Sequence, residues 1–315
     1  MLFNLVPEFL ACLAAPDPIA AYHEYLSRHR AVLASYWHNY VLDLDSPHAQ
    51  GVIASVLRAD RGDLHRLLAG ADVVTLAEEG LRRTLDQVEA DCPVDVYVMV
   101  GVGAANAGEL VVGGRGVAFV CLEHFTGRPN PETHGLGLAP ELMPLWIAHE
   151  VAHAVRYTSP TSRAELRRLV SDQGRGHYDY WETGSRATLR ELLVNEGLAV
   201  AAARAAAPGF EPWDYFGYTR RQYRRIRELD AFLRRACAPD LDAAGLGLRL
   251  RFLSDGLRPS ARQAGGKILP ERAGYYLGLR LVESHLAEHG LARTLRAPAE
   301  EIQRTEERAF GVHSA

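Results

Sequence analysis

The spacing of apolar residues along the chain predicts a helical first part, a short block of strands and a helical remainder. From Pro16 to about Asp91, apolar residues recur every three or four positions, as in amphipathic helices. From Val94 to Val100 the pattern alternates and is rich in β-branched residues, and Gly116–Leu122 is a second apolar run. Two or more strands, joined across Gly113–Gly114, are expected here. The pattern therefore predicts an α+β fold that is mostly helical, with a small central β-sheet.

The change of pattern near residue 92 also suggests how the chain is divided. At roughly 100 to 200 residues per domain, a chain of 315 residues corresponds to about two domains. We expect a helical N-terminal region over residues 1–92 and a second domain over residues 93–315.

Composition excludes several classes of protein. Apolar residues make up 48% and charged residues 23%, which is typical of an ordinary globular chain. With 35 Lys and Arg against 39 Asp and Glu, the net charge is −4, so no overall positive field would attract nucleic acid or an anionic membrane. The dense basic segment 220–227 is followed by Glu228 and Asp230, which favours ion pairing within the chain. No uninterrupted apolar stretch of about 18 residues predicts a membrane span.

The cysteines indicate a reducing environment. The four of them are scattered without a Cys-x-x-Cys pair, so they indicate neither a disulfide framework nor a thiolate zinc site. We therefore expect a cytoplasmic protein that binds neither nucleic acid nor membrane, and the sequence leaves its oligomeric state open.

The strongest chemical signal is the H-E-x-x-H pattern from His149 to His153, within an apolar helical stretch. Residues i and i+4 lie on one face of a helix, so both imidazoles can bind one Zn²⁺ while Glu150 projects beside them. This predicts one zinc ion per chain, held by His149 and His153.

A hydrolytic zinc site needs a third protein ligand. Glu196, in the segment Asn195-Glu196-Gly197-Leu198-Ala199, is the best candidate, because it lies in an apolar helical stretch where a carboxylate needs a cation. Glu191 is a weaker candidate, either as a ligand or as a group that orients a histidine.

Together, H-E-x-x-H and N-E-G-x-A resemble the gluzincins, zinc metallopeptidases whose third ligand is glutamate. Within that group the chain is most similar to the predicted zinc-dependent proteases of the YjaZ-like domain-of-unknown-function family, where a G-Y-x-x-G segment follows, here Gly274–Gly278. The similarity extends from about Val94 to Leu286. It implies a zincin-like catalytic domain over residues 93–315, with His149, His153 and Glu196 as ligands and Glu150 as general base. One departure is Val200, where the thermolysin-like branch has an aspartate that braces a histidine.

A hydrogen-bond donor for the developing oxyanion is sought in the helix after Pro270. Tyr275 shares an apolar stripe with Leu279, Val282 and Leu286, and it could point inward. Gluzincins commonly give this role to a tyrosine or histidine, so Tyr275 is a candidate. Tyr276 competes for the same role, and an ordinary core tyrosine is an equally good interpretation.

Two further segments have weaker signals. His285 to His289 spells H-x-x-E-H, the inverted zinc signature, but Gly290 indicates a helix end at which histidines are favourable without metal. His177 and Tyr178 lie in the connection between the two ligand segments, where they could touch a substrate or simply pack on the surface.

These observations predict a zinc-dependent metallopeptidase that acts on a peptide or protein substrate. In this hypothesis the zinc ion activates water and polarises the scissile carbonyl, and Glu150 transfers the proton. Two alternatives stay open: a zinc amidase acting on a small molecule, and an inactive zinc-containing protein with a binding or regulatory function.

Overall fold

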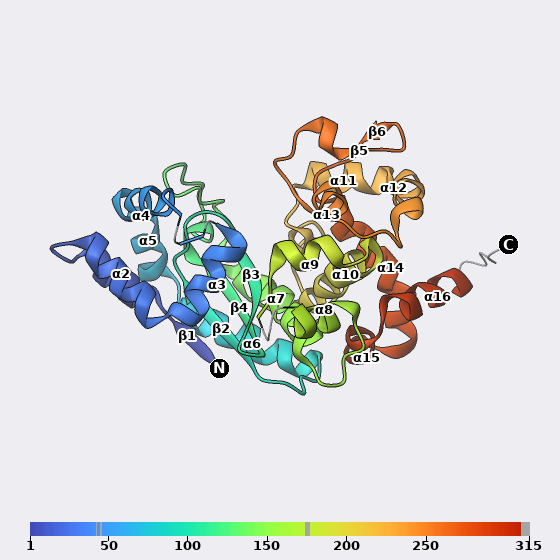
Figure 1. Cartoon of the computed structure of the whole chain (residues 1–315), viewed down its shortest axis with the longest axis horizontal. Coiled ribbons are helices and arrows are strands. Elements are labelled where there is room, and N and C mark those ends of the chain that lie inside the picture. The colour runs from blue at the N-terminus through green and yellow to red at the C-terminus, as the bar shows by residue number, and fades with distance from the viewer. Residues whose placement is uncertain (42, 45, 174–176, 310–315) are drawn as a thin grey trace.

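The computed structural model describes residues 1–41, 43, 44, 46–173 and 177–309, and it shows helices arranged around a small sheet (Figure 1). The sheet has four strands in the order β1-β2-β4-β3. β1 and β2 pair in parallel, as do β2 and β4, whereas β3 runs antiparallel to β4. Their bounds are β1 Leu2–Asn4, β2 Val94–Met99, β3 Ala107–Val112 and β4 Arg115–Cys121. The predicted α+β class is confirmed.

Both faces of the sheet are covered, which explains why its strands are almost continuously apolar. On one face, Gly116 of β4 lies against Ala154 of helix α7 (Met143–Thr158). On the other face, the ring of Phe119 makes edge contacts with Tyr36 and Tyr40 of helix α3 (Arg30–Tyr40), at centroid distances of 5.2 and 5.0 Å.

The first part of the chain contributes a strand as well as helices. β1 was not indicated by the sequence pattern, yet it adds to the sheet beside β2, and the Met1 amino group donates to the Val94 carbonyl over 2.8 Å. Residues on both sides of position 92 therefore share one sheet and one hydrophobic core, and the division at that position stays a prediction. The helices of this part are α1 Val6–Leu13, α2 Pro18–Arg28, α3 Arg30–Tyr40, α4 Ala49–Arg58, α5 Gly62–Gly70 and α6 Val73–Gln87.

Three long helices follow one another across the middle of the molecule (Figure 1). α7 (Met143–Thr158) packs on the sheet, α10 (Leu189–Ala206) packs on α7, and α14 (Ala273–His289) packs on α10. α11 to α13 (residues 220–253) and a two-stranded hairpin, β5 (Gln263–Ala264) with β6 (Lys267–Ile268), form a lobe beside α10 and α14 (Figure 1).

The remaining elements complete the second half of the chain. Their bounds are α8 Glu165–Gln173, α9 Tyr180–Arg186, α11 Arg220–Glu228, α12 Asp230–Cys237, α13 Leu246–Leu253, β5 Gln263–Ala264, β6 Lys267–Ile268, α15 Leu291–Arg296 and α16 Ala299–Ala309. Among the described residues, no helix combines the length and the apolar character that crossing a bilayer requires.

Candidate metal centre

α7 carries the H-E-x-x-H pattern in the centre of the molecule. Pro144 lies in its first turn, where a missing N–H costs nothing, and the helix is buried from Met143 to Tyr157. The rings of His149 and His153 lie one turn apart on the same face, with centroids 4.9 Å from each other. Because α7 is buried on all sides, most residues around His149, Glu150 and His153 are apolar.

α10 brings the third residue of the cluster. Thr188 caps the helix by accepting from the Glu191 amide, and Glu196 lies near its middle. One Glu196 carboxylate oxygen, Oε2, lies 3.2 Å from His149 Nε2 and 3.5 Å from His153 Nε2.

These three side chains fit a zinc ion. One ligand atom from each lies within 4.8 Å of the others, and all three residues are buried. Two imidazoles and a carboxylate are a donor set that catalytic zinc uses, with one further position left for water or substrate. Among the described residues, no group accepts a hydrogen bond from His149 Nδ1 or from His153 Nδ1. Val200, at the position where the thermolysin-like branch has an aspartate that braces a histidine, is apolar and fully buried.

The electrostatics of the cluster reflect two histidines that share one carboxylate. Burial opposes charge on every member, yet the neighbouring imidazoles hold the pKa of Glu196 well below its usual range. For His153, burial would lower the pKa, but the Glu196 carboxylate outweighs burial and raises the pKa to about 9. For His149, burial dominates and lowers the pKa. Glu196 is therefore ionised, as a metal ligand must be.

Glu150 lies beside the cluster and faces a second carboxylate. Burial raises its pKa well above the usual range, and the charge of Glu109 on β3 raises it further. Glu109 in turn accepts from the hydroxyls of Tyr40 (2.9 Å) and Tyr157 (3.2 Å), and Asn195 donates to the Tyr157 hydroxyl over 2.9 Å. The high pKa suits a group that must take and return a proton.

Sequence reasoning missed Glu109, and a signal for it was present. Glu109 is the single acidic residue in β3, whose other residues are small or apolar. A carboxylate inside a buried strand needs partners, so its position in the sequence already marked it as unusual.

The two candidate tyrosines face different surroundings. The Tyr275 ring stacks on His149 with centroids 5.9 Å apart, and the Arg272 guanidinium lies 4.3 Å from the Tyr275 centroid. Tyr276 packs instead against Phe216 and Tyr223. Tyr275 thus lies beside the cluster of His149, His153 and Glu196, whereas Tyr276 belongs to a separate aromatic group.

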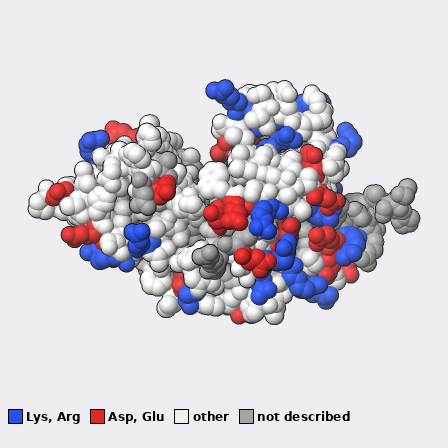
Figure 2. Space-filling view, in the orientation of Figure 1, with Lys and Arg blue, Asp and Glu red and all other residues white. Residues whose placement is uncertain are grey.

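A cavity of about 230 Å³ opens over the cluster. Its wall includes His149, Glu150, His153, Glu196, Tyr275, Glu109, Tyr40, Tyr180, Arg249, Arg272 and the loop that leads into β3. The surface is hollowed between the part that holds the N-terminal helices and the lobe of α11 to α13 (Figure 2). The cluster and the glutamate are therefore arranged at an accessible cavity.

The family comparison agrees with this geometry. Residues 177–304 match the family described as "Predicted Zn-dependent protease (DUF2268)". This confirms the resemblance predicted from the motifs, although the matched segment begins after Val94 and ends after Leu286. It contains Glu196 and Tyr275, whereas His149 and His153 precede it. Comparisons with curated proteins and with solved structures found no match.

Several residues noted in the sequence lie outside the cluster. Glu191 forms a fully buried ion pair with Arg156, with 2.7 Å between Oε1 and Nη2. His177 is exposed, and the Tyr178 hydroxyl accepts from Arg249. Neither His177 nor Tyr178 lines the cavity over the cluster, whereas Tyr180 does.

The inverted motif, His285 to His289, forms a hydrogen bond between α14 and α15. His285 is buried, and its Nδ1 lies 2.9 Å from the Thr294 hydroxyl of α15. In the described part of the chain, His285 and His289 form no three-residue group suited to a metal. In the basic segment, Arg225 pairs with Glu228 over 3.4 Å, as the sequence suggested.

Proposed function

We propose that the protein is a zinc-dependent peptidase that hydrolyses amide bonds in a peptide or protein substrate. The observation that carries this proposal is the buried His149, His153 and Glu196 group, which lies with Glu150 at one accessible cavity. The match to a family described as predicted Zn-dependent protease supports it.

His149, His153 and Glu196 would hold one zinc ion per chain. When bound, the ion supplies Lewis acidity, which polarises a scissile carbonyl and lowers the pKa of water. Glu150 takes the proton of the attacking water and then delivers it to the leaving amine. Its raised pKa makes Glu150 a stronger base, which favours the first transfer, in which the carboxylate takes the proton of water.

Tyr275 donates a hydrogen bond to the oxyanion that develops on the carbonyl. Its ring is fixed between His149 and Arg272, so the hydroxyl is oriented before the reaction begins. Burial raises the pKa of Tyr275, so its hydroxyl keeps its proton.

Other groups in the cavity favour a peptide over a small amide. Asn106 lies in the loop before β3, and its buried Nδ2 has no hydrogen-bond partner among the described residues. Arg249 and Arg272 add two cationic side chains to the wall. A peptide offers several carbonyls and carboxylates to these donors, whereas a small amide offers one carbonyl.

Metal analysis and turnover of three proteins test the proposal. Wild type should contain about one zinc per chain and cleave members of a peptide library. Glu150→Gln should retain zinc and lose at least a hundredfold in kcat, and Glu196→Ala should lose zinc affinity about tenfold or more. Full activity of Glu150→Gln would contradict the role of Glu150 as base. A screen that turns over only small amides would instead favour the amidase alternative.

The alternative of a closed, inactive zinc site needs a fourth protein ligand. Glu191 is bound to Arg156, His177 is exposed, and neither belongs to the group of candidate ligands found among the described residues. This supports a position free for water or substrate.

A further inference from the structure

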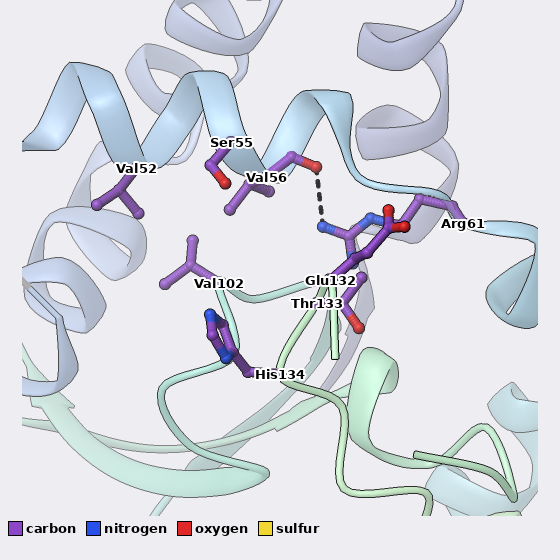
Figure 3. A pocket seen from close by; sticks show the side chains of 8 residues that line it. All are labelled: Val52, Ser55, Val56, Arg61, Val102, Glu132, Thr133 and His134. Carbon is purple, nitrogen blue, oxygen red and sulfur yellow. Dashed lines mark hydrogen bonds between the residues drawn. The ribbon is translucent and has the colours of Figure 1, made fainter. Parts of the chain in front are cut away.

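A second cavity, of about 130 Å³, lies at the N-terminal helices, apart from the metal centre. Its apolar wall is formed by Val52 and Val56 of α4 and by Val102 from the loop after β2, and their side chains point toward one another (Figure 3). The polar lining residues are Ser55, Arg61, Glu132, Thr133 and His134.

Arg61 is the unusual member of this lining. The residue is only 5% exposed, and one nitrogen, Nη2, donates to the Val56 carbonyl over 3.0 Å (Figure 3). Its Nε and Nη1 atoms are buried and have no hydrogen-bond partner in the part of the chain that the structure describes. The guanidinium carbon lies 5.5 Å from the Phe9 ring centroid.

Nearby acidic groups do not satisfy these donors. Glu123 accepts from the amides of Gly101 and Gly103, and Asp63 accepts from Asn130 and from the Leu64 amide. Burial consequently lowers the pKa of Arg61 despite the attraction of both carboxylates. A buried cation with two unpartnered nitrogens is costly, and an anion bound at one of them would reduce that cost.

We propose that this cavity is a binding site for a small aliphatic monocarboxylate. The carboxylate accepts from the Nη1 group of Arg61 at the end of the guanidinium, and the aliphatic body lies against Val52, Val56 and Val102. At roughly 30 Å³ per water molecule, the cavity has room for about four waters, which suits an acid such as isobutyrate.

The lining favours a carboxylate over a phosphate. The lining of this cavity includes one arginine, Arg61, and three valines make much of its wall apolar. The Glu132 carboxylate would repel a dianion more strongly than a singly charged group. A singly charged group with an apolar body matches all three features.

The site borders the wall of the catalytic cavity. Val102 lines the Arg61 cavity, while residues 104–106 of the same loop line the cavity over the metal cluster. Glu123 and the Tyr36 hydroxyl hold this loop through the amides of residues 101–103. The acid therefore binds apart from the metal cluster, and the inference does not rest on the proposed peptidase activity.

Isothermal titration of the zinc-loaded full chain with isobutyrate tests the inference, with isobutyramide as the neutral control of the same shape. Wild type should bind isobutyrate saturably, with a Kd on the order of 1 mM for so small a ligand. Isobutyramide should bind at least about tenfold more weakly, and so should isobutyrate to Arg61→Gln. No saturation of wild type by about 50 mM isobutyrate would overturn the proposal. Equal affinity of Arg61→Gln would also overturn it.

Two more variants locate the bound acid. Val52→Phe fills the cavity while keeping Arg61, so it should abolish binding, whereas Gly51→Ala on the same helix points into open space and should bind as wild type does. Glu196→Ala should bind isobutyrate unchanged. Loss of binding in Glu196→Ala would place the acid at the metal centre and refute the Arg61 site, and unchanged binding in Val52→Phe would refute it as well.

Discussion

Gly197 on α10 lies directly against Gly278 on α14. A Cβ atom at Gly197 would overlap the backbone carbonyl of Gly278, and a Cβ atom at Gly278 would overlap the carbonyl oxygen of Leu193. Glu196 immediately precedes one glycine, and Tyr275 lies one turn before the other. The contact of the two backbones therefore fixes the spacing between the helix that carries Glu196 and the helix that carries Tyr275.

Replacing Gly278 with alanine should push these two helices apart. Because the overlap is with backbone rather than with a flexible side chain, we expect a loss of about 1 to 3 kcal/mol or more in the free energy of unfolding. Urea unfolding measures this loss, and metal titration should show weaker zinc binding because Glu196 moves with α10.

Gly247→Ala on α13 is the matched control. Its added methyl meets nothing within 4 Å, so the variant should be neutral or more stable by up to about 1 kcal/mol. An unchanged unfolding midpoint for Gly278→Ala would show that the helices can separate without cost.

The two neighbouring tyrosines should differ sharply in their effect on turnover. Tyr275→Phe removes the hydroxyl beside His149 and should lower kcat by about a hundredfold, with a smaller change in KM. Tyr276→Phe leaves the ring packed on Phe216 and Tyr223, so kcat should change by less than about threefold. Steady-state kinetics on one peptide, with zinc content measured in parallel, separates the two. Equal effects would remove Tyr275 from the proposed mechanism.

Glu109 should set the acid limit of activity through its charge on Glu150. That charge raises the pKa of Glu150, so Glu109→Gln should lower it. The reaction needs ionised Glu150, and the acid limb of the kcat/KM profile should therefore shift to lower pH. A pH profile of wild type and Glu109→Gln measures the shift.

Glu141→Gln serves as the control for this profile, since Glu141 is exposed and lies outside the cavity lining. An acid limb that moves to higher pH in Glu109→Gln would show that Glu109 helps Glu150 to ionise, the opposite of the direction expected here.

The grouping of His149 with His153 and the fold class could be predicted because both depend on local patterns. Spacing of four residues on a helix brings His149 and His153 together whatever the rest of the fold does. Glu196 was predicted from a carboxylate in an apolar helix, and the structure places it 3.2 Å from His149 Nε2.

Contacts between distant segments could not be predicted in the same way. Glu109 reaches Glu150 only because β3 is the strand nearest the cavity, and strand order does not follow from periodicity. The choice between Tyr275 and Tyr276 required the rotation of α14, which the Gly197–Gly278 contact determines. The unpaired donors of Arg61 depend on three segments that are far apart in sequence, so no local signal marked them.

Asp91 and Arg296 should make the protein more stable at neutral than at acidic pH. Asp91 accepts from Ser159 and Thr161, over 2.9 and 2.5 Å, and from Arg296 over 3.2 Å, and so joins the approach to β2, the end of α7 and α15. Burial opposes its charge, but these donors lower its pKa to about 2, from an ordinary value of 3.8. A carboxylate with a lowered pKa stabilises the fold above its unfolded pKa, and this contribution is lost as the pH falls through the folded pKa.

We therefore expect Asp91→Asn to lose about 1 to 2 kcal/mol of unfolding free energy near pH 6, after allowing for solvent screening. The difference from wild type should stay constant down to about pH 4.5 and then shrink toward pH 2. Urea unfolding at a series of pH values measures this, with Asp86→Asn as the control, because the Asp86–Arg82 pair is exposed and 3.7 Å long. If the Asp91→Asn deficit grew as the pH fell, the ionised carboxylate could not be what binds these three segments together.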